Sequence, residues 1–129
     1  MYILLYSVGF ATWRDEFEWD EHKSEENLRL RGFDFAFATL IFDGARVVNP
    51  DLRKDYGEQR WVAIGVADGV HLTVVYTDRE PGVRVRDRTY TRPARRIISA
   101  RRSKRSERAE YEKRIKKILD EFAPKPGTR

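Results

Sequence analysis

Cysteine is absent from this chain of 129 residues, and only two histidines occur. Without cysteine the chain cannot form a disulfide framework, use a thiolate nucleophile or hold zinc through sulfur. The two histidines, His22 and His71, have no partner at a metal-ligand spacing, so we expect neither a metal site nor a cofactor. The lack of cysteine fits a reducing compartment, and we expect a cytoplasmic protein.

Long apolar segments and glycine-rich loops are missing as well. A membrane-spanning helix needs about 20 apolar residues, and no segment reaches that length, so we expect no membrane contact. Neither a phosphate-binding glycine loop nor a G-x-S-x-G motif occurs, which removes the signatures of nucleotide hydrolases, dinucleotide-binding folds and serine hydrolases. At this length a single domain is the default.

Positive charge is unevenly distributed along the chain. Residues 79–117 hold 16 of the 26 basic residues and 5 of the 21 acidic ones, a net charge of +11, whereas the rest of the chain carries −6. Arginine supplies 19 of the basic residues, and its planar guanidinium pairs with phosphate and stacks on bases. The pattern indicates a basic surface for an anionic partner, with nucleic acid favoured, although a solvated charged face fits the composition too.

Helix signals lie at both ends of the chain. Asp20 and Asp34 are placed to cap helices over residues 21–31 and 35–42. A third helix is expected from residue 103 or 106 to about residue 122. Its apolar stripe at helical spacing consists of Tyr111, Ile115, Ile118, Leu119 and Phe122.

Strand signals fill the middle. Residues 60–67 and 70–77 are strand-like runs separated by Asp68-Gly69, the two-residue loop typical of a type I′ hairpin. Further strands are expected over residues 46–49, 83–89 and 95–100. This order predicts an α+β domain with a mostly antiparallel four- to five-stranded sheet, two N-terminal helices and a C-terminal helix.

The side chains left for chemistry are arginines, a few carboxylates and tyrosines. Such a set can cleave RNA, because the ribose 2′-hydroxyl is itself the nucleophile. The protein must align that oxygen with phosphorus, stabilise charge on the phosphoryl oxygens and move a proton. Arginines meet the first two needs, and Glu58, Tyr76 or His22 is placed to meet the third. Any basic α+β domain would contain such side chains, so their presence alone does not establish RNA cleavage.

Three segments in a fixed order carry a more specific signal. They are F-E-W-D-E-H-K-S-E-E-N-L-R-L-R-G-F-D-F from residue 17, G-E-Q-R-W-V-A-I-G from residue 57 with L-T-V-V-Y-T from residue 72, and R-R-I-I-S-A-R-R-S-K-R-S-E-R-A-E-Y-E from residue 95. Over residues 17–112 the chain closely resembles the BrnT family, the ribonuclease toxins of type II toxin–antitoxin modules. The resemblance implies a RelE-like fold and metal-independent cleavage of RNA.

The resemblance also implies partners. A BrnA-like antitoxin, a ribbon-helix-helix DNA-binding protein, is expected to neutralise the toxin, and operator DNA is contacted only through that antitoxin. The expected assembly is a toxin–antitoxin heterotetramer. We expect the toxin domain over residues 17–122, an N-terminal extension over residues 1–16 and a disordered tail over residues 123–129.

Catalytic candidates follow from the same resemblance. Glu58 and Arg60 fall on the family's E-x-R-aromatic segment, and Arg96 and Arg101 fall on its I-S-A-R segment. The three arginines are expected to bind phosphate or stabilise the transition state, with Glu58 as general base and Tyr76 as a weaker candidate. Structural alternatives remain: an ion pair for Glu58 and Arg60, a solvated charge for Arg101, and a core position for Tyr76.

Four further residues are expected to bind RNA. Lys23 falls on the family's first-helix pattern and Arg102 on the I-S-A-R segment, whereas Arg84 and Arg86 belong to an extra stretch over residues 81–93.

The chain also departs from the family at the end of the first helix. Leu30-Arg31 stands where many members carry Lys-His before glycine, so a histidine that could transfer a proton is missing. A non-catalytic nucleic-acid-binding domain, or a degenerate toxin retained as an antitoxin-binding subunit, therefore remains an alternative.

Overall fold

The Asp68-Gly69 turn joins two central strands of the sheet. The computed structural model describes residues 2–4 and 16–122, and in it β4 (Trp61–Ala67) and β5 (Val70–Arg79) pair antiparallel around this turn. Both turn residues have positive φ, 48° for Asp68 and 81° for Gly69, as a type I′ turn requires. The predicted hairpin is therefore confirmed.

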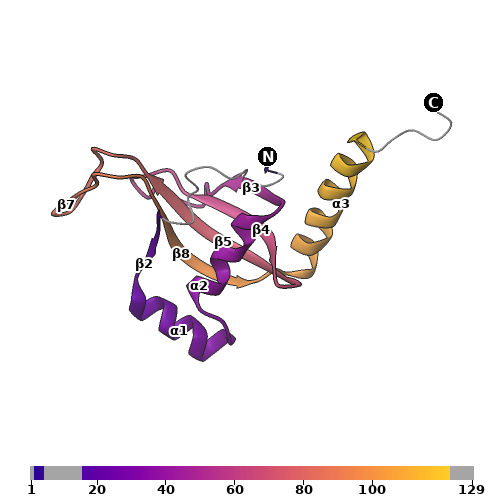
Figure 1. Cartoon of the computed structure of the whole chain (residues 1–129), viewed down its shortest axis with the longest axis horizontal. Helices are drawn as coiled ribbons and strands as arrows, with labels where there is room; N and C mark the ends of the chain where they lie inside the picture. The colour runs from indigo at the N-terminus through magenta and orange to yellow at the C-terminus, as the bar shows by residue number, and fades with distance from the viewer. Residues whose placement is uncertain (1, 5–15, 123–129) are drawn as a thin grey trace.

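Among the residues that the structure describes, six strands form the main sheet, one more than the four or five predicted, in the order β1-β3-β4-β5-β8-β2. Figure 1 labels all of them except β1. The strands β3 (Arg46–Pro50) and β8 (Ala94–Arg102) flank the hairpin in antiparallel pairing. At the two edges, β1 (Tyr2–Leu4) is antiparallel to β3, and β2 (Phe17–Trp19) is parallel to β8. The α+β class and the mostly antiparallel sheet are confirmed; short segments before the first helix supply both edge strands.

The aspartates predicted as caps begin the first two helices. The Asp20 carboxylate accepts a hydrogen bond from the Lys23 backbone at the start of α1 (Glu21–Arg31), and Asp34 does the same for Phe37 at α2 (Phe35–Ala38). The chain then continues as the 3-10 helix η2 (Thr39–Asp43), so the second predicted helix is α-helical only in its first turn.

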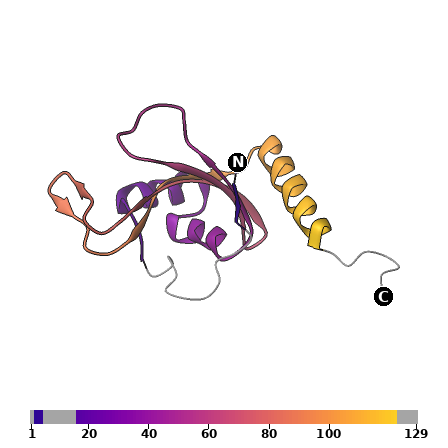
Figure 2. The same cartoon turned by 90° about the horizontal axis from the view of Figure 1, so that it is seen from above.

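The main core lies between these helices and one face of the sheet. Figure 2 shows α1 and α2 together on that side. The buried apolar side chains of the helical layer are Phe33, Phe35, Ala38, Ile41 and Phe42; those of the sheet include Ala63, Leu72, Val74, Tyr76 and Ile97. Their packing leaves η2 very close to β4, because a Cβ added to Gly65 would lie 2.8 Å from the Ile41 Cβ.

The opposite face of the sheet is only partly covered. The helix α3 (Arg105–Phe122) packs Tyr111 and Ile115 against Val47 and Ile64. Its second half extends beyond the sheet (Figure 1). The helix is confirmed, but its expected apolar stripe is buried only in part, since Leu119 and Phe122 are 63% and 76% exposed.

Within the described residues, the helices are all too short or too polar to cross a membrane. The expected extension over residues 1–16 lies mostly outside those residues, and the expected tail over residues 123–129 lies wholly outside them.

The prediction of a single strand over residues 83–89 is wrong. This segment folds instead into a separate two-stranded ribbon of β6 (Arg84–Val85) and β7 (Arg88–Thr89), reversed by a turn in which Arg86 has a φ of 56°. Backbone hydrogen bonds between residues 82–83 and Tyr90 close its base. The chain therefore turns back before it can join the sheet, and the ribbon lies at the opposite end of the molecule from α3 (Figures 1 and 2).

Replacing Gly65 tests the close approach of η2 to β4. We expect Gly65→Ala to lower the free energy of unfolding by about 1–3 kcal/mol, because the Ile41 side chain and backbone must move. The matched control is Gly44→Ala, where no atom lies within 4 Å of the added Cβ and the backbone is extended. Chemical denaturation measures both; equal effects of the two substitutions would contradict the packing described.

Candidate active site

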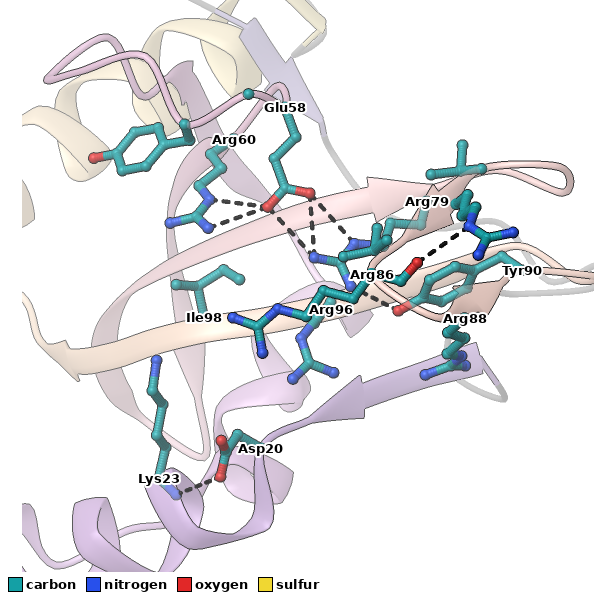
Figure 3. Close-up of a pocket in the computed structure, with 15 residues that line it drawn as sticks. Asp20, Lys23, Glu58, Arg60, Arg79, Arg86, Arg88, Tyr90, Arg96 and Ile98 are labelled. Atoms are coloured by element: carbon teal, nitrogen blue, oxygen red, sulfur yellow. Dashed lines mark hydrogen bonds and ion pairs between the residues drawn. The ribbon is translucent and has the colours of Figure 1, made fainter.

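A groove opens on the incompletely covered face of the sheet, between the segment before β4, the β6–β7 ribbon and the start of α1 (Figure 3). Its volume is about 790 Å³, which is within the range of ligand sites and admits groups the size of a nucleotide. The lining is dominated by charged side chains: Asp20, Lys23, Glu58, Arg60, Arg79, Arg84, Arg86, Arg88 and Arg96. Such a surface suits an anionic ligand.

Glu58 lies between two guanidinium groups at one side of the groove. Its Oε2 is 3.1 Å from Arg60 Nη2, and its Oε1 accepts hydrogen bonds of 3.3 and 3.2 Å from Nε and Nη2 of Arg79. The Arg60 guanidinium also stacks 4.3 Å from the centre of the Tyr56 ring. The ion pair considered as an alternative for Glu58 and Arg60 is therefore present, and Arg79 extends it.

The interactions continue through Tyr90 to the other side of the groove. Arg79 Nη1 donates to the Tyr90 hydroxyl at 2.6 Å, and that hydroxyl donates to Glu18 Oε2 at 2.7 Å. Glu18 also accepts from Arg96 at 2.7 Å and pairs with Arg88 at 3.0 Å. An unbroken polar network thus joins Glu58 to Arg96 through Arg79, Tyr90 and Glu18. Figure 3 shows its part from Glu58 to Tyr90.

The electrostatics of Glu18 follow from this position. Its partial burial raises the pKa of the carboxyl, but the hydrogen bonds from Tyr90 and Arg96, with the charges of Arg88 and Arg96, outweigh the burial and leave the pKa below the ordinary value. Glu18 is therefore ionised at neutral pH, and it acts as the anionic partner that keeps two arginines in place.

A β-bulge in β8 decides which side chains face the groove. Ile97 lies opposite Tyr76 and Ser99 opposite Val75, so Ile98 is an additional residue in the strand. Ile97 is buried in the main core, whereas Arg96 and Ile98 line the groove on the other face.

Three of the expected RNA-binding cations also line the groove. Lys23, Arg84 and Arg86 are exposed, and no ion pair to any of them is found in the part of the chain that the structure describes. Arg84 only donates to the backbone carbonyl of Arg86, at 3.2 Å. These cations are available to a phosphate without the loss of an existing carboxylate partner.

The remaining predicted site residues lie elsewhere. Tyr76 is 2% exposed in the core on the opposite face of the sheet, where its ring packs edge-on against Phe42 and burial raises the pKa of its hydroxyl. Arg102 lies beside a shallow apolar depression next to α1. His22 is exposed on α1 and does not line the groove. For Tyr76 the structure favours the core alternative.

Arg101 is held at the start of α3 by Glu107. Its guanidinium donates to both carboxylate oxygens, at 2.6 and 2.9 Å. The same carboxylate accepts from the Lys104 backbone at 2.7 Å, which satisfies a free N–H at the helix end. Hydrogen bonding from Arg101, chiefly, lowers the pKa of Glu107 to about 2, although burial acts in the opposite direction. Arg101 therefore has a structural partner and does not line the groove.

Four residues of the network are not among the site residues predicted from the sequence: Glu18, Arg79, Arg88 and Tyr90. Arg79 and Arg88 had a signal, because both lie in the basic stretch of residues 79–117. Glu18 and Tyr90 had none, since their contacts join segments that are distant in the sequence. Within residues 2–4 and 16–122, no group of three or more histidine, aspartate or glutamate side chains is arranged to hold a metal ion.

Comparison with protein families gives a match over most of the chain. The family model described as "Ribonuclease toxin, BrnT, of type II toxin-antitoxin system" matches residues 19–107. This span includes every residue that lines the groove. No match was found among curated proteins.

The Arg101–Glu107 pair predicts a pH-dependent contribution to stability. The folded-state pKa of Glu107, about 2, lies below its ordinary value of 4.5. Its contribution is therefore complete above about pH 4.5 and is lost as the pH falls toward 2. We expect Glu107→Gln to lower the free energy of unfolding by about 1–2 kcal/mol at pH 7, with the difference from the unsubstituted protein shrinking below pH 4.5.

Urea denaturation at pH 7, 5, 4 and 3 measures this difference. The matched control is Glu110→Gln on the same helix, which removes only an i,i+4 pair with Arg114 at the surface and should cost about 0.3–0.5 kcal/mol. A Glu107→Gln effect no larger than that of Glu110→Gln would refute the structural role of the pair.

Proposed function

The chain belongs to the BrnT ribonuclease toxins of type II toxin–antitoxin systems, and from this membership we propose that it is an endoribonuclease that cleaves RNA in the groove around Glu58 without a metal ion. The observation that carries the proposal is that Glu58, Arg60 and Arg96 line a single groove with three cations, Lys23, Arg84 and Arg86, for which the described residues provide no ion pair. RNA cleavage by its own 2′-hydroxyl needs this combination of a base, charge stabilisation and backbone binding.

The exposed cations bind the substrate first in this mechanism. Lys23, Arg84 and Arg86 contact the phosphates on either side of the scissile bond and fix the RNA in the groove. Because single-stranded RNA carries one charge per phosphate, each contact displaces counterions and makes binding depend on salt. These contacts position the substrate but do not take part in bond breaking.

Chemistry begins when the scissile phosphate reaches Arg60. The Glu58–Arg60 separations of 3.1–3.2 Å are longer than the 2.7–2.9 Å typical of strong charged pairs, so a dianionic transition state can compete for the guanidinium. Arg60 then turns from Glu58 to a phosphoryl oxygen. That exchange frees one side of the Glu58 carboxylate to act as general base.

The bond changes follow from that arrangement. Glu58 takes the proton of the 2′-hydroxyl, the 2′-oxygen forms a bond to phosphorus, and the bond from phosphorus to the 5′-oxygen breaks. Arg60 and Arg96 stabilise the charge on the non-bridging oxygens during this step. The 5′-oxygen takes a proton from solvent, and the products are a 2′,3′-cyclic phosphate and a 5′-hydroxyl end.

Membership of a type II family also implies an antitoxin partner. We propose a BrnA-like, ribbon-helix-helix antitoxin whose acidic segment covers the basic groove, in a heterotetramer that reaches operator DNA only through the antitoxin. Within this proposal the toxin fold is RelE-like. The charge of the groove supports an acidic inhibitor, because such a segment would compete directly with RNA phosphates.

A non-catalytic RNA-binding domain is the alternative function. The observation that favours it is the pairing of Glu58 with both Arg60 and Arg79, which occupies the carboxylate proposed as the base. In that reading the groove binds RNA through its free cations and cuts nothing. Cleavage assays distinguish the two functions.

Removal of the base or of either arginine should abolish most of the activity. With the purified protein in EDTA, we expect RNA to be cut to cyclic-phosphate products. We expect Glu58→Gln to reduce kcat about 10²–10⁴-fold, and Arg60→Ala or Arg96→Ala about 10²–10³-fold. The control is Arg114→Ala, which removes a guanidinium from the surface of α3 and should leave kcat unchanged. Tight binding of RNA without cleavage would refute the ribonuclease proposal in favour of the alternative.

Arg84 and Arg86 on the β6–β7 ribbon should affect the affinity for RNA rather than the rate of bond cleavage. In a Glu58→Gln background, we expect Arg84→Ala with Arg86→Ala to weaken RNA binding at low salt. The slope of log affinity against log salt should become shallower by about 1.4, from about 0.7 per lost phosphate contact on a single strand. Fluorescence anisotropy over a salt series measures the slope. An unchanged slope would exclude both arginines from phosphate contact.

A further inference from the structure

Tyr90 is the most enclosed polar residue of the groove. It is 3% exposed, and its hydroxyl lies between Arg79 Nη1 at 2.6 Å and Glu18 Oε2 at 2.7 Å. The Arg88 guanidinium covers its ring at 4.0 Å from the centroid. No other side chain among the described residues hydrogen-bonds to both the Glu58–Arg79 and the Glu18–Arg96 parts of the network.

The backbone of the ribbon fixes where Tyr90 lies. Its carbonyl accepts from the Gly82 N–H at 2.7 Å, and its own N–H donates to the Val83 carbonyl at 2.8 Å. Gly82 has a φ of 92°, a conformation that side-chain-bearing residues rarely adopt. The base of the ribbon therefore holds the tyrosine ring in one position relative to β5 and β2.

The direction of the two hydrogen bonds is fixed by chemistry. A guanidinium has only donors, and an ionised carboxylate has only acceptors. The Tyr90 hydroxyl carries one proton, so that proton must point at Glu18 while a lone pair accepts from Arg79. The hydroxyl is thus polarised in one sense, from the arginine that pairs with Glu58 toward the carboxylate that pairs with Arg96.

We propose that Tyr90 is a positioning residue for RNA cleavage, coupling the Arg79–Glu58 pair to the Glu18–Arg96 pair so that base and phosphate-binding arginine keep their catalytic separation. This inference rests on the proposed ribonuclease function. Tyr90 does not touch the reacting atoms: it shares Arg79 with Glu58, and it shares Glu18 with Arg96. The Arg79–Glu58 contacts, at 3.2 and 3.3 Å, are thereby kept longer than the 2.7 Å contact between Arg96 and Glu18.

Loss of the hydroxyl should therefore act on turnover rather than on binding. In Tyr90→Phe the ring and its stacking on Arg88 remain, but Arg79 loses its hydrogen bond to the hydroxyl and approaches Glu58 more closely. We expect kcat to fall on the order of tenfold, with KM changed less than twofold because the free cations are untouched. A nearer cation favours the ionised form of the base, so the acidic limb of the kcat–pH profile should move to lower pH.

Tyr111→Phe is a matched control for the loss of a buried hydroxyl. Tyr111 is 8% exposed, and its hydroxyl donates one hydrogen bond, to the Ala45 carbonyl at 3.2 Å, far from the groove at the docking site of α3. Both substitutions should cost similar stability, about 1 kcal/mol. Only Tyr90→Phe should alter kcat and its pH profile.

Glu18→Gln provides a second route if Tyr90→Phe does not fold. It keeps an oxygen that accepts from the Tyr90 hydroxyl but removes the charge that holds Arg96 and Arg88, so kcat should again fall with KM nearly constant. If Tyr90 acts through Glu18, the double variant should lose little more than the more damaging single variant. Full additivity of the two losses would overturn the coupling.

All of these proteins are assayed together on the same RNA. Cleavage by the unsubstituted protein and by Tyr111→Phe, with kcat of Tyr90→Phe reduced, supports the inference. Cleavage by the unsubstituted protein with kcat of Tyr90→Phe within twofold overturns it and leaves the ribonuclease proposal intact. Absence of cleavage by the unsubstituted protein overturns the proposed function and this inference with it.

Discussion

Two carboxylates, Glu18 and Glu58, hold the arginines of the groove together, and the rest of the site depends on this pairing. Guanidinium groups gathered on a half-buried surface repel one another unless anions lie between them. Glu58 is shared by Arg60 and Arg79, and Glu18 accepts from Arg96. Because β2 supplies Glu18, the short parallel strand at the sheet edge is needed to neutralise the basic face as well as to extend the sheet.

The parts of the fold that could be predicted are those encoded by near neighbours. Asp68-Gly69 specifies its turn through its own backbone preferences, and Asp20 and Asp34 cap helices through atoms three residues away. The ribbon and the bulge at Ile98 could not be found in this way. Their conformations depend on pairing between segments that only the folded sheet brings together, and an alternating pattern such as that of residues 83–89 does not reveal its partner.

The candidate site likewise contains residues that could be predicted from near neighbours in the sequence and residues that only the fold brings together. Glu58 and Arg60 were found because they lie two residues apart in a recognisable segment, and they do lie together. The charge of residues 79–117 overstated the basic surface, because Arg79 and Arg95 in that stretch are buried against Glu58 and Asp78. Composition counts charges but does not say which of them have partners.

The division between paired and unpaired cations has a consequence for selectivity. A groove of free arginines would bind any polyanion, and it would hold substrate and product equally well. In the function proposed for this groove, the exposed cations on the ribbon and α1 attract phosphate, but Arg60 binds it only by giving up its contact with Glu58. That exchange is favourable in proportion to the charge on the ligand, and the charge is greatest in the pentacoordinate transition state. In the proposed mechanism the network therefore directs the strongest binding toward the reacting phosphate, as catalysis requires.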